Sequence, residues 1–259
     1  VSIAPVGDKF YDKLTWEIDY LTRKRNIKLA KKYGVNKYIY PSTCSVYGFS
    51  KSYRLLDEKS KLDPKSMYAK AQSKLESFAL NQGDEKFCIS ILRLPTVFGL
   101  SPRTRFDVII NALVFDVLEK KRINLLRDGK QRRPFVHVKD VANAFIFFIK
   151  TDSNKINNQI FNVGDEINNI NLLSLSKLIF KVTQIKENIV WYGKSDDRSY
   201  YVSFNKIKKI GFKAKYDIKF GIKELTKAYK KRTLIRTEDS INIKWLNKLE
   251  SNKRKFLNK

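Results

Sequence analysis

Apolar residues recur with two periods along the chain, and the two periods alternate. Helical spacing predicts helices over 11–33, 64–82, 106–120, 141–150, 172–183, 205–210 and 218–229. Short, nearly continuous apolar runs predict strands at 37–40, 87–94, 160–163 and 189–192, with a further short segment at 136–138. We expect Asp63 to cap the second helix, because Pro64 suits its first turn.

Buried strands separated by helices predict an α/β fold with a doubly wound parallel sheet. A sheet of this kind that binds a nucleotide carries a glycine-rich turn after its first strand. The 259 residues contain no GxGxxG pattern. Either the fold is of another kind, or the chain lacks the beginning of the sheet. The strand-like start at residues 1–4 favours the second interpretation.

Composition excludes several classes of protein. Apolar residues make up 42% of the chain, enough to bury a core, which excludes a disordered protein. The longest apolar run, near 141–149, is interrupted by Asn143 and is too short to cross a membrane. Two cysteines, Cys44 and Cys88, cannot form a disulfide framework, and no signal peptide is recognisable. We therefore expect a cytoplasmic protein with no membrane partner.

The charge is strongly positive, with 53 Lys and Arg against 26 Asp and Glu and a formal net charge of +27. Such a surplus attracts phosphate groups, whether of a nucleotide ligand or of a nucleic acid. It is also spread along the chain, in runs at 28–32, 206–209, 227–232 and 253–255, as general drift in composition would produce. Charge alone leaves both explanations open.

Hydroxyl groups gather directly after the first predicted strand, in the run STCSVYG at 42–48. Ligands of a parallel sheet bind beyond the carboxyl ends of its strands, so these groups are well placed. Tyr68 follows in the first turns of a helix, and a phenol exchanges a proton with a carbinol or carbonyl oxygen if a cation lowers its pKa from ~10. Thr43 would hold the same oxygen. One histidine and two distant cysteines give no metal site.

Six short stretches occur together in the order and approximate spacing of a known family. They are LTWEI at 14–18, YIYPSTCSVYG at 38–48, PKSMYA at 64–69, LRLPTVFG at 92–99, RPFVHVKDVA at 133–142 and FNVG at 161–164. Over roughly residues 1–230 the chain resembles the extended short-chain dehydrogenase/reductase superfamily, and within it the NAD-dependent epimerase/dehydratase family that acts on nucleotide sugars. The resemblance implies an absent N-terminal βαβ unit with the glycine loop, so we expect these residues alone to bind NAD weakly.

The resemblance also implies a division into lobes. Residues 1–100 and 134–165 would form the remaining part of a Rossmann-like dinucleotide-binding domain. Residues 101–133 and 166–231 would form a substrate-binding lobe, and 232–259 a basic C-terminal extension. The implied partners are a nucleotide-sugar substrate and a second copy of the chain, bound through the helices near 11–33 and 64–82.

By the same resemblance, Thr43 is the catalytic Ser/Thr and Tyr68 the catalytic acid/base. The family has a lysine four residues after the tyrosine, which holds the nicotinamide ribose and lowers the pKa of the phenol. Gln72 stands at that position, one helical turn from Tyr68 and on the same face. It can still hydrogen-bond a ribose but brings no charge. We therefore expect slow chemistry or an alkaline optimum.

A second departure bears on the reaction. Family members that dehydrate the sugar carry an Asp-Glu pair after the Ser/Thr, where this chain has Cys44 and Ser45. Neither side chain supplies that acid and base, so 4,6-dehydratase activity is not expected. The resemblance then implies an NAD-dependent epimerase or keto-sugar reductase, with NADP as a further possibility. The alternative is a non-catalytic member of the fold that binds RNA through its basic surface.

The resemblance suggests the remaining ligand contacts. For the cofactor these are Ala4, Ser42, Tyr68, Gln72, Pro95 and Val97. For the substrate they are Ser45, Arg105, Asn111, Arg133 and Arg198. His137 is expected to be packed rather than catalytic, and Asp140 to anchor the substrate lobe.

Overall fold

A three-stranded parallel sheet forms the centre of one half of the molecule. The computed structural model describes residues 9–50, 54–194 and 199–257. The sheet consists of β1 (Lys37–Thr43), β2 (Cys88–Leu94) and β6 (Gln159–Asn162), paired in the order β1-β2-β6. The predicted parallel α/β sheet is confirmed, with its three strands at the predicted places.

The register aligns the carboxyl ends of β1 and β2. Thr43 pairs with Leu94, so the segments that follow both strands leave the sheet at the same edge. Every residue of β2 except Leu94 is buried, which explains its continuous apolar pattern. The edge where functional groups were expected therefore exists as predicted.

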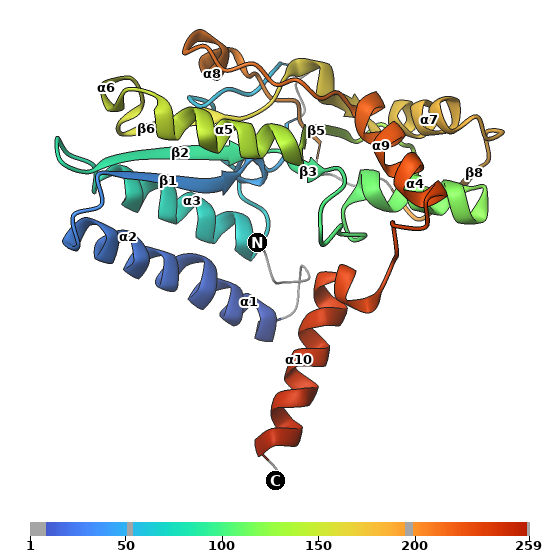
Figure 1. The fold of residues 1–259 in the computed structure, drawn as a ribbon, viewed down its shortest axis with the longest axis horizontal. Helices are drawn as coiled ribbons and strands as arrows, with labels where there is room; N and C mark the ends of the chain where they lie inside the picture. The colour runs from blue at the N-terminus through green and yellow to red at the C-terminus, as the bar shows by residue number, and fades with distance from the viewer. Residues whose placement is uncertain (1–8, 51–53, 195–198, 258–259) are drawn as a thin grey trace.

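Helices cover both faces of this sheet (Figure 1). The first rod runs through α1 (Lys9–Trp16), the π-helical turn η1 (Glu17–Thr22) and α2 (Arg23–Lys32). It lies beside α3 (Met67–Leu80) below the sheet as drawn, and α5 (Val138–Lys150) and α6 (Ser153–Ile156) lie above it. The predicted long first helix is confirmed, but its periodicity did not reveal the π-helical turn.

The start of α3 differs from the prediction. Ser66, not Asp63, caps the helix, and its hydroxyl accepts a hydrogen bond from the backbone N–H of Ala69 at 3.2 Å. Asp63 lies before the helix, and its N–H donates to the carbonyl of Val46, in the turn after β1, at 3.0 Å. Gly48 permits this approach: it has φ +69°, and a Cβ there would lie 1.8 Å from the Asp63 carbonyl oxygen. The contact fixes the start of α3 against the end of β1.

The other half of the molecule has smaller sheets. One contains β3 (Thr96–Phe98), β5 (Arg132–His137) and β7 (Asn169–Asn171), with β3 parallel and β7 antiparallel to β5. The other pairs β4 (Ile123–Leu126) with β8 (Ile189–Tyr192) in parallel. The segment predicted at 136–138 is thus the end of a longer strand, and Val138 already begins α5.

Three helices enclose a second apolar core next to these sheets. They are α4 (Ile109–Lys120), α7 (Leu172–Thr183) and α9 (Ile218–Lys230). The short elements are η2 (Cys44–Tyr47), η3 (Glu166–Asn168), α8 (Asn205–Lys209) and η4 (Glu238–Ser240). Asp140 at the start of α5 ties the halves together, since its carboxylate accepts from the N–H groups of Lys215 and Tyr216 at 2.9 and 3.0 Å. The exact lobe boundaries stay a prediction.

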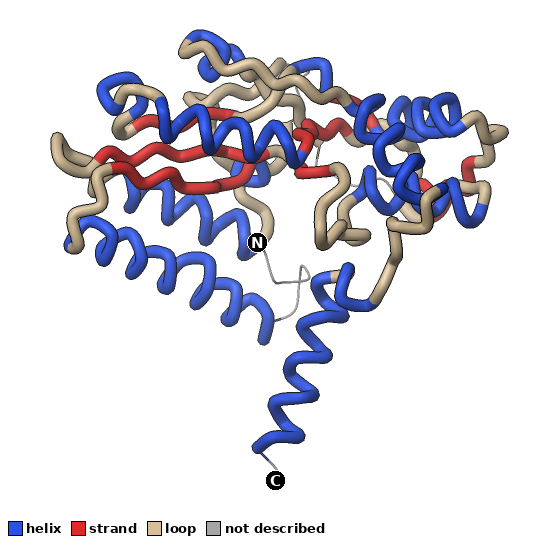
Figure 2. Tube along the Cα trace, in the orientation of Figure 1, coloured by secondary structure: helices blue, strands red, loops and turns tan. Residues whose placement is uncertain are grey.

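The last helix, α10 (Asn242–Leu257), projects away from both halves (Figure 2). Its first residues are fastened to the loop before α4: Arg103 donates to the Asn242 side chain at 3.1 Å and stacks on the Trp245 ring at 5.1 Å. The expected basic extension is therefore a helix over most of its length. In the portion of the chain that the structure describes, none of the helices combines the length and apolarity of a membrane span.

Candidate active site

Thr43 and Tyr68 meet at the carboxyl end of β1. Thr43 is the last residue of the strand, and its hydroxyl caps the following turn by accepting from the N–H of Ser45 at 3.1 Å. Tyr68 lies in the first turn of α3, where the Thr43 hydroxyl is close enough to its phenol to favour the phenolate by hydrogen bonding. The two groups proposed to share one substrate oxygen are thus neighbours.

Tyr68 is protonated at neutral pH in this structure. Burial is the largest influence and raises the pKa of the phenol to about 12, with the Asp19 carboxylate adding to the increase. Arg23, the hydrogen bond from Thr43 and Arg105 act in the opposite direction. Two guanidinium groups therefore act on a tyrosine that lacks the family's lysine.

Gln72 is completely buried one turn further along α3. Its Oε1 accepts a hydrogen bond from the hydroxyl of Tyr40, which in turn accepts from Arg23 Nη1 at 3.3 Å. Within the residues that the structure describes, its Nε2 has no hydrogen-bond partner. Because the oxygen is engaged, the end of the amide left over is the donor end. A ribose hydroxyl could accept a hydrogen bond from it.

Two side chains of the hydroxyl-rich run turn into the interior. Ser42 is 3% exposed and donates to the Glu76 carboxylate, so its side chain is already engaged within the core. Cys44 is buried against β2, and burial raises the pKa of its thiol. Ser45 remains exposed. Of the Cys44–Ser45 pair only the serine faces the ligand side, and neither is an acid.

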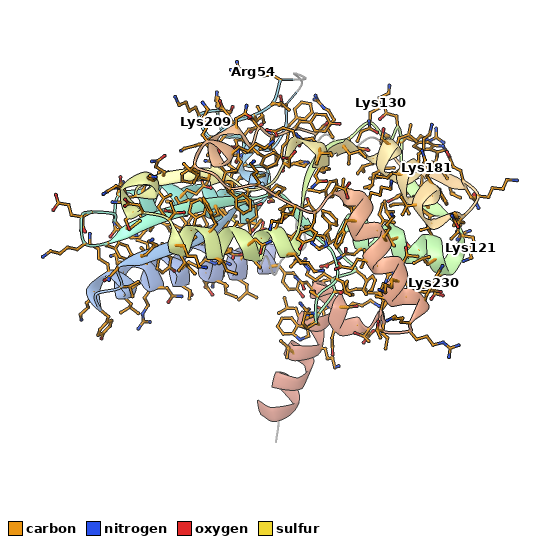
Figure 3. All side chains as sticks on the ribbon, turned by 45° about the horizontal axis from the view of Figure 1, so that its top comes forward. Arg54, Lys121, Lys130, Lys181, Lys209 and Lys230 are labelled. Atoms are coloured by element: carbon orange, nitrogen blue, oxygen red, sulfur yellow. The ribbon has the colours of Figure 1, made fainter. Side chains whose placement is uncertain are left out.

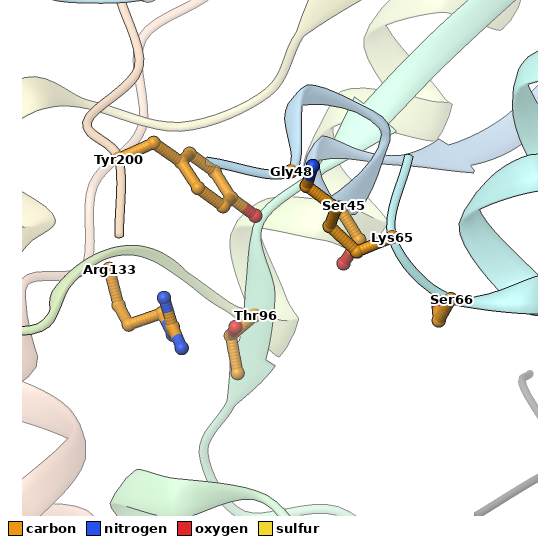
Figure 4. A pocket seen from close by; sticks show the side chains of 7 residues that line it. All are labelled: Ser45, Gly48, Lys65, Ser66, Thr96, Arg133 and Tyr200. Atoms are coloured by element: carbon orange, nitrogen blue, oxygen red, sulfur yellow. The ribbon is translucent and has the colours of Figure 1, made fainter. Parts of the chain in front are cut away.

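A polar cavity of about 350 Å³ opens at this edge (Figure 4). Its lining residues come from the turn after β1, the segment before α3, β3, β5 and the segment before α8: Ser45, Gly48, Lys65, Ser66, Thr96, Arg133 and Tyr200. Ser45 and Arg133 were predicted as substrate contacts, and the structure brings both to one cavity. Among the described residues, the lining carries four hydroxyls, two cations and no carboxylate.

Gly48 closes the hydroxyl-rich run at 42–48, and the sequence reasoning missed the other four lining residues: Lys65, Ser66, Thr96 and Tyr200. A signal existed for three of them. Lys65 and Ser66 lie within the stretch that leads to Tyr68, and Thr96 follows a buried strand in the stretch at 92–99. Tyr200 comes from a remote part of the chain, and its place depends on the tertiary packing of its ring near Tyr47 at 6.2 Å.

The other predicted contacts are less directly supported. Arg105 makes a two-pronged ion pair with Asp107, at 2.9 Å for both bonds. Asn111 is 3% exposed, and its amide bonds the Gly99 N–H and the Arg105 carbonyl, both at 3.0 Å. Pro95 is buried between β2 and β3, and Val97 packs on the core. These four stay predictions.

Ala4 and Arg198, predicted as a cofactor and a substrate contact, lie outside the described residues. Their proposed roles therefore rest on the resemblance of the sequence alone.

His137 is packed, as expected. It is completely buried; its Nδ1 accepts from the Lys139 N–H at 3.2 Å and its Nε2 bonds Glu224 at 3.1 Å. Burial lowers the pKa of the imidazole, so the ring is neutral and serves as the cap of α5. Among the described residues, no three His, Cys, Asp or Glu side chains are grouped to hold a metal ion.

The basic side chains do not concentrate on one element. Figure 3 labels six of them: Arg54 and Lys209 lie at the end that carries α8, and Lys121, Lys130, Lys181 and Lys230 lie on the half that carries α4, α7 and α9. No observation on the described residues supports the RNA-binding alternative.

Comparison with known proteins agrees with the fold and the motifs. The model of the NAD dependent epimerase/dehydratase family matches residues 4–164. A mouse dTDP-D-glucose 4,6-dehydratase is 28% identical over 215 residues, covering 79% of this chain and 59% of the relative. A UDP-glucuronate 4-epimerase of Thermodesulfobacterium geofontis is 27% identical over 203 residues, covering 76% of this chain and 60% of the relative.

Solved structures share the fold. The UDP-glucuronic acid 4-epimerase of Bacillus cereus, in complex with UDP-glucuronic acid and NAD, superposes with a TM-score of 0.73 at 20% identity, covering 83% of this chain and 68% of that one. The chain spans about three fifths of the length of the curated relatives it matches. The family model covers more than half of the chain. The chain belongs to the NAD dependent epimerase/dehydratase family.

Proposed function

We propose that the protein is an NAD-dependent enzyme that epimerises or reduces a nucleotide-activated sugar by hydride transfer. The observation that carries this proposal is the placement of Tyr68, at the start of α3, beside Thr43, at the carboxyl end of β1, next to a polar cavity. A phenol in contact with a second hydroxyl is suited to exchange a proton with a carbinol or carbonyl oxygen. Relatives with matching sequence are named for dTDP-glucose and UDP-glucuronate chemistry.

The residues present fit a nicotinamide cofactor. The buried, unpartnered Nε2 of Gln72 is a donor that a ribose hydroxyl would satisfy. When bound, the cofactor would supply a hydride acceptor for an oxidative step as NAD+ and a hydride donor for a reductive step as NADH. Tyr68 removes the proton from the sugar hydroxyl or returns it, and Thr43 holds the same oxygen through its hydroxyl. NADP would serve the same chemistry.

The cavity favours epimerisation or reduction over dehydration. Although some relatives are named 4,6-dehydratases, elimination of water needs an acid for the leaving hydroxyl and a base for the carbon-bound proton. The described residues that line the cavity include no carboxylate, and Cys44 is turned into the core. Exchange of a proton and a hydride needs only Tyr68, Thr43 and the cofactor.

Arg133 is expected to bind the anionic part of the substrate. It lines the cavity from β5, and a guanidinium suits phosphate or carboxylate oxygens. Arg133→Gln should weaken binding of UDP- and dTDP-sugars about 10- to 100-fold, a loss of ~1.4 to 3 kcal/mol, measured by calorimetric titration. Lys209→Gln, on the exposed end of α8, is the control. Equal affinities for the two variants would place the anion elsewhere.

We further propose that two copies associate through α1 and α3. A largely apolar groove there is lined by Asp12, Lys13, Trp16, Glu17, Leu21, Met67 and Lys70. It contains acids and bases as well as apolar groups, so two copies of one face complement each other. Leu21 is 49% exposed although it is a large apolar residue.

Leu21→Asp should convert a dimer to a monomer at micromolar concentration, because it places a charge in the apolar contact. Sedimentation equilibrium measures the change. Ile149→Asp, a similarly exposed position on α5 across the sheet, is the matched control and should keep the dimer. A monomeric wild-type chain, or equal behaviour of both variants, would exclude this interface.

A further inference from the structure

A buried ion pair lies at the π-helical turn of the first helical rod. Asp19 is completely buried, and its Oδ1 lies 2.8 Å from Nη2 of Arg23, whose side chain is 20% exposed. Neither carboxylate oxygen receives a hydrogen bond in the described structure. Burial raises the pKa of Asp19, and the charge of Arg23 counteracts that effect. The pair is therefore held by charge alone, at a helical irregularity of the kind that accompanies functional sites.

The guanidinium connects this pair to the active-site helix. Its Nη1 donates to the Tyr40 hydroxyl at 3.3 Å, and that hydroxyl donates to Oε1 of Gln72. Tyr40 is 2% exposed and Gln72 is fully buried, so solvent does not interrupt the chain of bonds. The sequence of contacts runs from Asp19 through Arg23 and Tyr40 to Gln72.

The direction of these bonds decides which way the Gln72 amide points. Tyr40 donates its proton to Oε1, and its oxygen accepts from Arg23. Among the described residues the Nε2 donors are then without a partner in a buried place, which is unfavourable unless a ligand satisfies them. A flipped amide would lose the hydrogen bond that Oε1 now accepts from Tyr40.

We propose that Arg23 is a positioning residue that supplies part of the role of the absent lysine: through Tyr40 it holds Gln72 with its donor end toward a ligand, and it brings a cation to Gln72, one helical turn from Tyr68. This inference rests on the proposed function, because that function makes Tyr68 the acid/base and Gln72 a contact of the cofactor ribose. The cation comes from the neighbouring helix instead of from α3 itself.

The charges around Tyr68 support this assignment. Asp19 and Arg23, on the first helical rod, and Arg105, in the loop before α4, change the pKa of Tyr68 through their charges. The Tyr40 phenol on β1 also interacts electrostatically with Tyr68. After burial, Asp19 is the strongest influence that raises the pKa of Tyr68, and Arg23 the strongest that lowers it. Removing one of the two charges should therefore move the pKa in a known direction.

The test is a titration of Tyr68 in the whole chain without substrate. Tyrosine labelled with ¹³C at Cζ reports each phenol, and the Tyr68 resonance is the one missing from Tyr68→Phe. Asp19→Asn keeps the shape and removes the opposing charge. It should lower the pKa of Tyr68 from about 12 by on the order of one unit, a tenfold increase in tyrosinate at a given pH.

Two further variants separate charge from structure. Asp19→Asn combined with Arg23→Met should return the pKa to the wild-type value or above it. Arg23→Lys should stay close to wild type, because it keeps the charge. These variants also keep the test decisive if Asp19→Asn alone fails to fold.

An unchanged Tyr68 pKa in folded Asp19→Asn would overturn the proposal, and so would an equal decrease in the double variant. The titration needs neither NAD nor a sugar, so it fails independently of the proposed function. If the shifts occur as expected while Tyr68→Phe keeps full turnover, the relay stands and the proposed reaction falls.

Discussion

Tyr68→Phe is expected to reduce turnover of the nucleotide sugar by about a hundredfold to ten-thousandfold, because it removes the group that carries the proton. The ring remains, so the packing of α3 against β1 should hardly change. Turnover is measured with excess NAD and a panel of UDP-, GDP-, CDP- and dTDP-sugars, on the protein that carries this chain. Tyr33→Phe, at a phenol that is 75% exposed, is the matched control.

The pH dependence provides a second reading of the same experiment. Burial raises the pKa of Tyr68 to about 12, so tyrosinate makes up only about one part in 10⁵ at pH 7 before a ligand binds. The oxidative step needs tyrosinate as the base, so its rate should rise as the pH rises. A rate that stays flat above pH 7, or a Phe variant as fast as the control, would show that Tyr68 is not the base.

Thr43→Val should have a smaller effect than Tyr68→Phe. The substitution keeps the branched shape but removes the hydroxyl that bonds the Tyr68 phenol. The loss of one hydrogen bond to the reacting oxygen predicts a decrease in kcat of about 10- to 100-fold. The decrease should appear in kcat more than in KM, because the bond matters most as charge develops on the oxygen.

Much of the fold could be predicted because local pattern and tertiary burial agree. β2 is buried along nearly its whole length, and its apolar run therefore predicted both the strand and its central place. The start of α3 was predicted wrongly at Asp63. The backbone of Asp63 is hydrogen-bonded to the turn after β1, and Gly48 leaves room for this approach. No pattern in the neighbouring residues predicts such a tertiary contact.

The candidate site could be predicted for those residues whose role follows from their residue type and from their position at the end of a strand or the start of a helix. Thr43 ends a strand and Tyr68 begins a helix, so their residue types and places were readable, and their contact follows from the sheet. The environment of Gln72 was not readable. The missing lysine suggested an uncharged site. In the structure Arg23 is connected to Gln72 through Tyr40, and it comes from a helix more than forty residues earlier, directly after a π-helical turn. Sequence periodicity does not report that change of phase.

The end of β1 is held in place by a buried ion pair beneath it. Arg93 of β2 donates to the Glu76 carboxylate of α3 with Nε at 3.0 Å and Nη2 at 2.7 Å, and both side chains are 3% exposed. Arg93 also donates to the Tyr47 hydroxyl at 2.9 Å, and Ser42 donates to Glu76. The network joins β1, β2 and α3 directly behind Thr43.

Arg93→Met should therefore lower the free energy of unfolding by about 3–5 kcal/mol, because it leaves the Glu76 charge buried without a partner. Urea unfolding followed by circular dichroism measures the change. Lys120→Met breaks an exposed pair with Asp116, whose N–O distance is 3.2 Å, and should cost less than about 1 kcal/mol. The double variant Arg93→Met, Glu76→Met should recover part of the loss, since it removes the isolated charge as well. If Arg93→Met costs no more than Lys120→Met, the ion pair does not hold the strand ends, and Thr43 must be positioned by the turn after β1 alone.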